Sequence, residues 1–287
     1  MKSNDNEKNK ISPSTLYLVG TPIGNLSDIS ERAKKTLRDV DFIAAEDTRC
    51  AMKLLTNLNI KNNTVSYYEH NKKVSGQRIV ERLLGGESCA LITDAGMPAI
   101  SDPGEDLVAL CQENGITVSV IPGPCAAISA LALSAISSAR FAFEGFLPAQ
   151  KNERRKRLEG LIYEERTMIF YEAPHKLVST LTDMCDILGE ERRISLCREL
   201  TKLNEEIIRT TISKALEIYS DKEPKGEYVL VLEGGKEKRS ASEDLLTLTV
   251  EEHIQYYIDL GESKMDAIKK VAKDRGVHKS EIYKHTI

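Results

Sequence analysis

The sequence has no long apolar run and no cysteine pairing pattern, and these absences exclude several classes of protein. No stretch approaches the roughly 18 consecutive apolar residues that a membrane helix needs. The polar segment 1–10 lacks the apolar core of a signal peptide, so we expect a disordered lead-in at 1–13 and a cytoplasmic protein. The six cysteines are scattered without a Cys-x-x-Cys pair or a nearby histidine, which favours reduced, buried thiols. No residue pattern is typical of a metal site.

What the sequence does have is the length and composition of an α/β enzyme. With 287 residues, 41% of them hydrophobic, the chain can bury the cores of two domains and an appendage. Strands and helices alternate up to about residue 121, which predicts a wound α/β domain, and strands adjoin more often afterwards, which predicts a mixed sheet. We expect α/β domains at 14–121 and 122–236, and a linker with a small helix-turn-helix-like module at 237–287.

Apolar periodicity and turn residues give each element approximate bounds. The predicted strands are 15–19, 41–45, 64–67, 89–93, 116–121, 141–146, 166–171, 193–198, 205–210 and 227–232. The predicted helices are 28–38, 48–58, 75–84, 103–114, 125–137, 152–162, 174–188, 213–220, 264–275 and 278–285.

The clearest candidate ligand site is the loop 93–104, which follows the apolar strand 89–92. Its sequence, Thr-Asp-Ala-Gly-Met-Pro-Ala-Ile-Ser-Asp-Pro-Gly, is rich in small residues that let a ligand approach the main chain. In open α/β sheets, ligands collect at the carboxyl ends of strands. The loop contains no lysine or arginine, which argues against a nucleoside triphosphate and suits a cationic ligand. Asp102 also has the position of a helix N-cap, so that role stays open for it.

Three further strands end in turns of the same character. These turns are Gly20 to Leu26, Pro122-Gly-Pro124 and Ala173-Pro-His175. A single Gly/Pro turn is usually a plain connector. Four of them at successive strand ends predict one composite site.

Motifs spread over most of the chain together resemble one known family. They are Gly20-Thr-Pro-Ile-Gly-Asn-Leu26, Ala45-Glu-Asp-Thr-Arg49, Thr93 to Gly104, Pro122-Gly-Pro124, Phe143-Glu-Gly-Phe-Leu-Pro148, Phe170-Tyr-Glu-Ala-Pro-His175, Arg198-Glu-Leu-Thr-Lys202 and Gly226-Glu-Tyr-Val229. In this order they resemble the ribosomal RNA small subunit methyltransferase I family of the tetrapyrrole methylase superfamily, over about residues 14–236. Many tetrapyrrole methylases have Gly-Asp-Pro where this chain has Gly96-Met97-Pro98, and this departure favours the RNA branch of the superfamily.

The resemblance implies a fold, an activity and a set of partners. The fold is the two-domain α/β fold of the tetrapyrrole methylases (class III methyltransferases), with a small C-terminal helical appendage. The activity is transfer of a methyl group from S-adenosylmethionine to the ribose 2′-hydroxyl of a cytidine in the decoding region of 16S rRNA, in the 30S subunit, by a homodimer without a metal. The cofactor-binding residues that it implies are Pro22, Gly24, Asp94, Gly96, Met97, Ile100, Ser101, Cys125, Ala126, Tyr171, Gly226 and Glu227.

Three carboxylates are candidates for the base that removes the hydroxyl proton: Glu46, Asp47 and Glu199. All three are expected at strand ends, where they could meet a bound substrate. Asp47 could instead cap the helix that follows it, and Arg49 could simply pair with a carboxylate. The sequence does not rank the three. His70 and His175 stand beside predicted helix starts, which is more typical of a structural role.

The formal net charge is −4, yet basic residues gather in two segments. Segment 151–157 holds five basic residues and one acidic residue, and segment 264–287 holds seven and three. Such clusters can neutralise phosphates, although a solvated helix face or a plain helical hairpin would have the same pattern. The residues expected to contact RNA are Arg49, Lys151, Arg154, Arg155, Arg157 and Lys202. A small-molecule methylase and a non-catalytic RNA-binding protein stay open as alternative functions.

Overall fold

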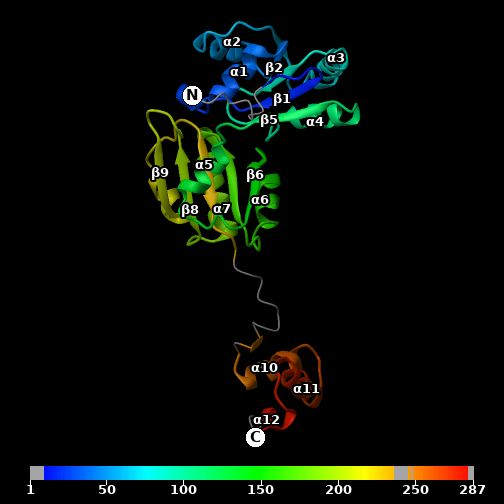
Figure 1. The fold of residues 1–287 in the computed structure, drawn as a ribbon. Coiled ribbons are helices and arrows are strands. Elements are labelled where there is room, and N and C mark those ends of the chain that lie inside the picture. Colours follow the sequence, from blue (N-terminus) through cyan, green and yellow to red (C-terminus); the bar gives the residue numbers. More distant parts are fainter. Residues whose placement is uncertain (1–9, 236–244, 247, 284–287) are drawn as a thin grey trace, which may run out of the picture. The chain divides into compact units, whose positions relative to one another are not determined.

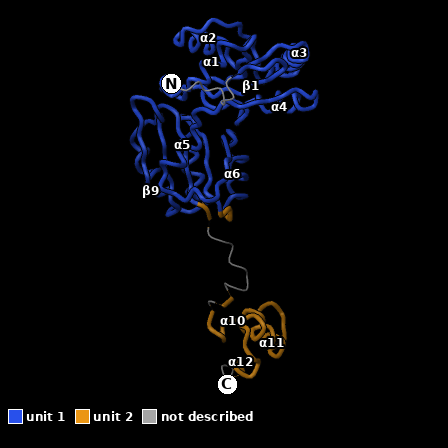
Figure 2. The backbone as a smooth tube through the Cα atoms, viewed as in Figure 1, with its two compact units in different colours: residues 1–162, 166–233 blue, residues 163–165, 234–287 orange. Residues whose placement is uncertain are grey.

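The computed structural model describes residues 10–235, 245–246 and 248–283, which form two compact units (Figures 1 and 2). The larger unit comprises residues 1–162 and 166–233, and the smaller unit comprises 163–165 and 234–287. Residues 1–9 of the expected lead-in and residues 237–244 of the expected linker lie outside the described residues. Among the described residues, no helix has both the length and the apolar character needed to cross a membrane.

The first half of the larger unit is a five-stranded sheet in the order β3-β2-β4-β1-β5, in which all the strands pair in parallel. The strands are β1 (Thr15–Val19), β2 (Phe42–Ala45), β3 (Thr64–Ser66), β4 (Cys89–Ile92) and β5 (Thr117–Ile121). The connecting helices are η1 (Leu26–Asp28), α1 (Glu31–Asp39), α2 (Thr48–Asn57), α3 (Lys72–Leu84) and α4 (Gly104–Glu113). The prediction of a wound α/β domain is confirmed, and its sheet is parallel.

This sheet has a hydrophobic core on each face. Strands β2 and β4 are buried along their whole length, which is typical of strands covered by helices on both sides. Within β1, Leu16 packs into the cluster that contains Leu107 of α4, whereas Tyr17 packs into the cluster that contains Leu37 of α1. The period-2 alternation of a strand therefore divides β1 between two cores.

The second half of the larger unit is a mixed five-stranded sheet in the order β6-β7-β10-β8-β9. Only β6 and β7 pair in parallel, and the other neighbours are antiparallel, so the expected mixed sheet is confirmed. Its strands are β6 (Phe141–Phe146), β7 (Thr167–Glu172), β8 (Arg193–Arg198), β9 (Glu206–Thr211) and β10 (Tyr228–Leu232). Its helices are α5 (Ala126–Leu133), α6 (Lys151–Glu159), α7 (Pro174–Leu188) and α8 (Ile212–Ile218).

The two faces of this second sheet carry different helices. Helix α5 covers one face with Ala127, Ala130 and Leu131, where Ile169 and Tyr171 of β7 meet it. Helices α6, α7 and α8 cover the other face, which also receives Met168 and Phe170. Tyr171 therefore points to the α5 side of the sheet, and this position bears directly on the site described below.

Two helix ends differ from the sequence prediction for local reasons. Helix α1 begins at Glu31, capped by Ser30, because residues 26–28 form a separate 3-10 turn that Asn25 caps. Helix α5 ends at Leu133 although apolar residues continue to Ile136. The Ser134 hydroxyl donates to the Leu131 carbonyl and accepts from the Ile136 amide, and Ala135 has a left-handed φ of 57°, so the chain turns out of the helix.

The smaller unit contains the helices α10 (Val250–Asp259), α11 (Lys264–Asp274) and α12 (Lys279–Tyr283). Thr249 and Glu252 form a capping box at the start of α10, and Ser263 caps α11. The side chains of Ile254, Ile268, Val271 and Ile282 share a core. The helices expected at 264–275 and 278–285 correspond to α11 and α12, and residues 284–287 lie outside the described residues; α10 was not predicted.

Candidate functional site

A cavity of about 580 Å³ lies within the larger unit, where strand ends of both sheets meet. This volume is in the range of small-molecule sites. The first sheet contributes Ile23 after β1 and residues of the loop after β4, namely Thr93, Asp94, Ala95, Gly96, Met97 and Ile100. The second half contributes Cys125, Ala126, Phe146, Tyr171, Glu172, Ala173, Pro174, His175, Cys197, Leu200, Lys202, Glu227, Tyr228 and Val229.

Three of the four strand-end turns contribute residues to the cavity, and the fourth, 122–124, does not line it but contacts the turn after β1. The turns after β1 and β5 touch through their main chains, because a Cβ on Gly20 would lie 2.6 Å from the Cα of Gly123. No residue larger than glycine leaves room for this approach. The turn after β1 also pairs with the β4 loop, since Thr21 N donates to Gly96 O (2.9 Å) and Gly96 N donates to Thr21 O (3.2 Å).

Strained backbone shapes the β4 loop. Gly96 has a φ of +85°, and the non-glycine residues Ala99 and Ser101 have φ values of +65° and +66°. Such residues persist only where the surroundings hold them. Asp102 supplies that hold, since its carboxylate accepts hydrogen bonds from the amides of Ala99 (3.0 Å), Ile100 (3.2 Å) and Gly104 (2.7 Å). Helix α4 begins at Gly104 with Pro103 at its N-cap, so Asp102 is not the N-cap and instead holds the loop before the helix.

Most of the expected cofactor residues line the cavity. They are Asp94, Gly96, Met97, Ile100, Cys125, Ala126, Tyr171 and Glu227. Pro22, Gly24, Ser101 and Gly226 do not line it. The two glycines among these residues instead leave room for a neighbouring side chain. A Cβ on Gly24 would lie 2.4 Å from Lys202 Cγ, and one on Gly226 would lie 2.5 Å from Glu199 Cγ.

Lys202 projects into the cavity between two carboxylates. Its Nζ donates to Glu199 Oε1 (2.8 Å) and Glu227 Oε2 (2.7 Å). The hydrogen bond from Lys202 lowers the pKa of Glu199. Partial burial lowers the pKa of Lys202, but the hydrogen bonds to Glu199 and Glu227 outweigh it, so this pKa lies above its ordinary value. Lys202 is therefore a cation whose charge is already balanced, which weakens the RNA contact expected of it.

Asp47 and Arg49 form the helix cap and the ion pair that the sequence left open as alternatives. Asp47 caps α2 by accepting from the Arg49 amide (2.8 Å), and Arg49 Nη2 donates to Asp47 Oδ2 (2.7 Å). The hydrogen bonds from the Arg49 side chain lower the pKa of Asp47 to about 2. Neither residue lines the cavity. A carboxylate with so low a pKa is a weak proton acceptor.

Glu46 and Asp94 differ from Asp47 in their electrostatics. Partial removal from water raises the pKa of the Glu46 carboxyl, and the charges of Asp94, Asp102 and Asp47 raise it further, although the residue keeps an exposed surface. The pKa of Asp94 is also raised, chiefly by the same loss of solvation. Glu46 Oε2 accepts from the hydroxyl of Thr93 (3.2 Å), which lines the cavity. Glu46 itself does not line the cavity, and of the three carboxylates expected as bases it is the one whose pKa is raised.

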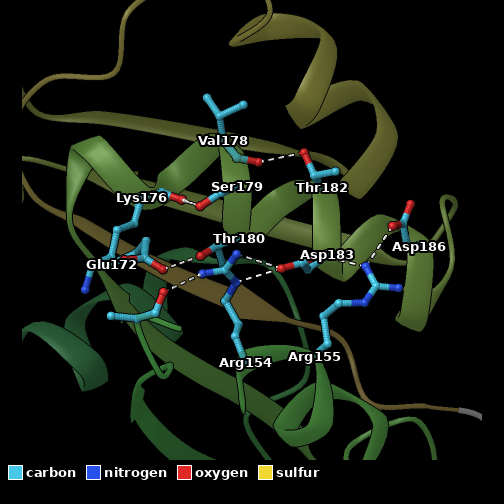
Figure 3. Close-up of polar contacts among 11 residues, drawn as sticks. Arg154, Arg155, Glu172, Lys176, Val178, Ser179, Thr180, Thr182, Asp183 and Asp186 are labelled. Carbon is cyan, nitrogen blue, oxygen red and sulfur yellow. Dashed lines mark hydrogen bonds and ion pairs between the residues drawn. The ribbon is translucent and has the colours of Figure 1, made fainter. Parts of the chain in front are cut away.

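The basic segment 151–157 forms helix α6, and much of its charge is used inside the protein (Figure 3). Arg154 has a buried side chain, and its Nη2 lies 2.7 Å from Asp183 Oδ2 of α7. Arg155 bridges Asp183 (2.8 Å) and Asp186 (2.9 Å). Arg157 pairs with Glu144 of β6. The RNA contact expected of Arg154 does not fit its burial, whereas Lys151 and Lys156 have exposed side chains.

Sequence reasoning missed several residues that line the cavity. Glu172 is buried, and its carboxylate accepts from the Ala173 amide (2.8 Å) and the Thr180 hydroxyl (2.6 Å; Figure 3). His175 also lines the cavity, although it was set aside as structural. Phe146 lines the cavity with 59% of its surface exposed. The signal for Phe146 was available, because an aromatic residue follows a glycine in the motif 143–148.

The cysteines only partly match the expectation of buried thiols. All six are free, but Cys50 in the first turn of α2 is exposed, and Cys125 and Cys185 are only partly buried. The prediction of a buried thiol is therefore wrong for Cys50. In the part of the chain that the structure describes, no group of three or more His, Cys, Asp or Glu side chains could hold a metal ion.

The fold and the cavity define a class of protein. The chain matches the tetrapyrrole (corrin/porphyrin) methylase family over residues 15–216. Solved structures with a similar fold include a diphthine synthase (13% identity, TM-score 0.59, covering 76% of this chain and 90% of that one). Another is the uroporphyrin III C-methyltransferase of Thermus thermophilus (14% identity, TM-score 0.55, covering 76% and 97%). The larger unit thus has the fold of a tetrapyrrole methylase.

Curated relatives narrow the class further. A protein of Halalkalibacterium halodurans is 47% identical over 284 residues, which cover 99% of this chain and 98% of that protein. One of Bacillus subtilis is 48% identical over 270 residues, which cover 93% and 92%. Both are named ribosomal RNA small subunit methyltransferase I. The chain belongs to the ribosomal RNA small subunit methyltransferase I family of the tetrapyrrole methylases.

The buried pair of Arg154 and Asp183 predicts an unequal response of two aspartates. Asp183→Ala leaves a buried guanidinium without its carboxylate and should lower the free energy of unfolding by about 3–5 kcal/mol. Asp186→Ala removes the other, exposed partner of Arg155 and should cost less than about 1 kcal/mol. Urea denaturation of the two variants measures the difference. Equal losses would contradict a structural role for the buried pair.

Proposed function

We propose that this protein transfers a methyl group from S-adenosylmethionine to the ribose 2′-hydroxyl of a cytidine in the decoding region of 16S rRNA, within the 30S subunit. The observation that carries the proposal is the 47% identity, over 99% of the chain, to a protein named ribosomal RNA small subunit methyltransferase I. The family resemblance adds that the enzyme works as a homodimer in the cytoplasm. The cavity supports the chemistry of this proposal.

The cavity suits a cationic cofactor. S-adenosylmethionine supplies an activated methyl group on a positively charged sulfonium sulfur. The β4 loop offers main-chain groups at Gly96 and Met97, contains no basic residue and carries the carboxylate of Asp94, while Glu46 accepts a hydrogen bond from Thr93 at the start of the loop. Cys125 and Ala126, at the start of α5, would complete the binding surface from the other sheet. Opposite charge near a bound cation favours its binding.

Methyl transfer to a hydroxyl needs little covalent help from the protein. Orientation of the two reactants is the main contribution, and it can supply several kcal/mol, up to about 10 kcal/mol in well-held systems. The cavity's position between two sheets allows the β4 loop to orient the cofactor while β6, β7 and β8 orient the nucleotide. Among the three expected carboxylates, we assign proton removal to Glu46. Hydrogen bonds from Arg49 and Lys202 stabilise the anions of Asp47 and Glu199, which makes these two carboxylates weaker bases.

The RNA must also be held outside the cavity. Lys151 and Lys156 present exposed ammonium groups on α6. Arg154, Arg155 and Arg157 fix that helix to α7 and β6 through their ion pairs. We therefore assign phosphate contact to the two lysines and a supporting role to the arginines. Phosphate contacts of this kind orient an RNA without reading its sequence.

The proposed reaction predicts where a methyl label appears. With 30S subunits from cells that lack this gene and labelled S-adenosylmethionine, label should enter 16S rRNA and survive alkali in dinucleotides. A methylated 2′-oxygen cannot attack the adjacent phosphate, so the chain is not cleaved at that position. Label in mononucleotides would identify a base as the target. Transfer to a tetrapyrrole ring, with none to 30S subunits, would replace the proposal by a small-molecule methylase.

Cofactor binding and RNA binding should separate in two variants. Gly96→Val places a β-branched residue at a φ of +85°, which disrupts the β4 loop, so calorimetry should detect no S-adenosylmethionine binding. The double variant Lys151→Gln, Lys156→Gln should bind the cofactor normally. Its 30S affinity should fall, and the slope of affinity against salt should decrease by about one to two units. Cofactor loss in both variants would contradict this division of roles.

The assignment of the proton acceptor predicts a pH dependence. Because the base must be deprotonated, kcat should rise with pH through the pKa of Glu46, which burial raises above its ordinary value, and then level off. Glu46→Gln should lower kcat by about 10²- to 10⁴-fold and remove this rise. Asp47→Asn serves as the control and should keep the rise. An unchanged pH profile in Glu46→Gln would assign the base elsewhere.

A further inference from the structure

Phe146 is an apolar aromatic side chain that the fold leaves in solvent at the cavity. It is the last residue of β6, it lines the cavity, and 59% of its surface is exposed. Exposure of a large apolar ring beside a binding cavity costs solvation free energy unless a ligand covers it. Ile100, on the β4 loop across the same cavity, is also exposed, at 47%.

A β-bulge gives Phe146 its position. Strand β6 pairs in parallel with β7, with Phe143 opposite Ile169, but the register then shifts so that Gly145 is opposite Phe170 and Phe146 is opposite Tyr171. Gly145 has a φ of +65°, which is the conformation that a glycine bulge requires. Without the extra residue, Gly145 would stand opposite Tyr171. Because of the bulge, Phe146 and not Gly145 stands on the face of the sheet that Tyr171 and the cavity occupy.

A neighbouring ring, that of Tyr171, contacts Phe146. Its centroid lies 5.5 Å from that of Tyr171 at an interplanar angle of 60°, and Tyr171 in turn lies 5.1 Å from Phe143 at 70°. Phe143 and Tyr171 pack on the α5 core. The three rings form a series from the core to the cavity, in which Tyr171 and Phe146 meet in a T-shaped contact. The remaining exposed surface of Phe146 is available to a planar ligand.

We propose that Phe146 is the platform on which the nucleobase of the target nucleotide stacks. The proposal rests on the proposed function and names what the cavity recognises in the RNA. A base removed from its own stack exposes a π-face, and proteins that bind unpaired RNA commonly cover that face with an aromatic ring. Stacking on Phe146 would hold the ribose of the same nucleotide near the β4 loop, where the cofactor is bound.

The contact between β6 and the β4 loop fits this arrangement. A Cβ on Gly145 would lie 3.5 Å from Ser101 Oγ, so the bulge and the loop are neighbours. The base on Phe146 and the cofactor on the β4 loop would therefore occupy adjacent parts of one cavity. A positioning role of this kind affects substrate binding and orientation without a covalent step.

The experiment compares Phe146 with Phe141, which begins the same strand, is 40% exposed and does not line the cavity. Phe146→Ala should raise KM for 30S subunits by about 5- to 100-fold, the usual range for loss of one stacked base. The variants Phe146→Tyr and Phe146→Trp should stay within about threefold of the wild type, because they keep a π-face. Phe141→Ala should have the wild-type KM, and all variants should bind S-adenosylmethionine normally.

The chain contains no tryptophan, so Phe146→Trp also introduces a unique fluorescent probe. A short oligocytidylate should quench the indole of Phe146→Trp by stacking, whereas inorganic polyphosphate should not. Phe141→Trp is the matched control and should respond to neither. Because this titration requires no catalysis, it tests the platform even if the wild type fails to methylate 30S subunits, which would be the failure of the proposed function.

Four results would overturn the inference. A wild-type KM for Phe146→Ala with active enzyme would exclude a role for the ring in RNA binding. Loss of S-adenosylmethionine affinity in Phe146→Ala, or quenching of Phe146→Trp by the cofactor alone, would assign the ring to the adenine of the cofactor. Equal quenching of Phe146→Trp and Phe141→Trp by oligocytidylate would show unspecific contact.

Discussion

The site depends on a contact between two glycines. Gly20 follows β1 and Gly123 follows β5, and their main chains approach so closely that a side chain on either residue would overlap the other. This contact brings the turn after β1 against the turn after β5, which leads to α5 and the second sheet. The pairing of Thr21 with Gly96 then fixes the β4 loop to the same point. The close approach of the turns beside the cavity is possible because Gly20 and Gly123 carry no side chain at their contact.

Electrostatics divides the carboxylates around that cavity into two groups. Asp47 and Glu199 each accept hydrogen bonds from a neighbouring cation and remain ionised. Glu46 and Asp94 stand near other acids and are partly removed from water, so both have raised pKa values. The same acids that could hold a positively charged cofactor therefore also raise the proton affinity of a neighbouring base. One arrangement of charge can thus serve binding and catalysis together.

The sequence predicted most of the fold because apolar periodicity and turn residues agree along the chain. The β4 loop and the ends of β7 and β8 were located correctly for the same reason. The ranking of the carboxylates could not be predicted, because it depends on partners distant in sequence, such as Thr93 for Glu46. The role of Arg154 was misjudged because a basic run does not reveal the buried Asp183 on another helix. The bulge at Gly145 depends on the register with β7, which no local pattern encodes.

The left-handed residues beside the cavity have a consequence for how this protein can change. Ala99 and Ser101 on one loop, and Glu199 and Thr201 on another, each have a positive φ without being glycine. Each such conformation costs of order 1–3 kcal/mol, so these loops keep their shape at the expense of stability. Glycine at these positions would relieve the backbone and also allow it more freedom. Glycine substitutions that were selected only for thermal stability would therefore make the loops beside the cavity more flexible.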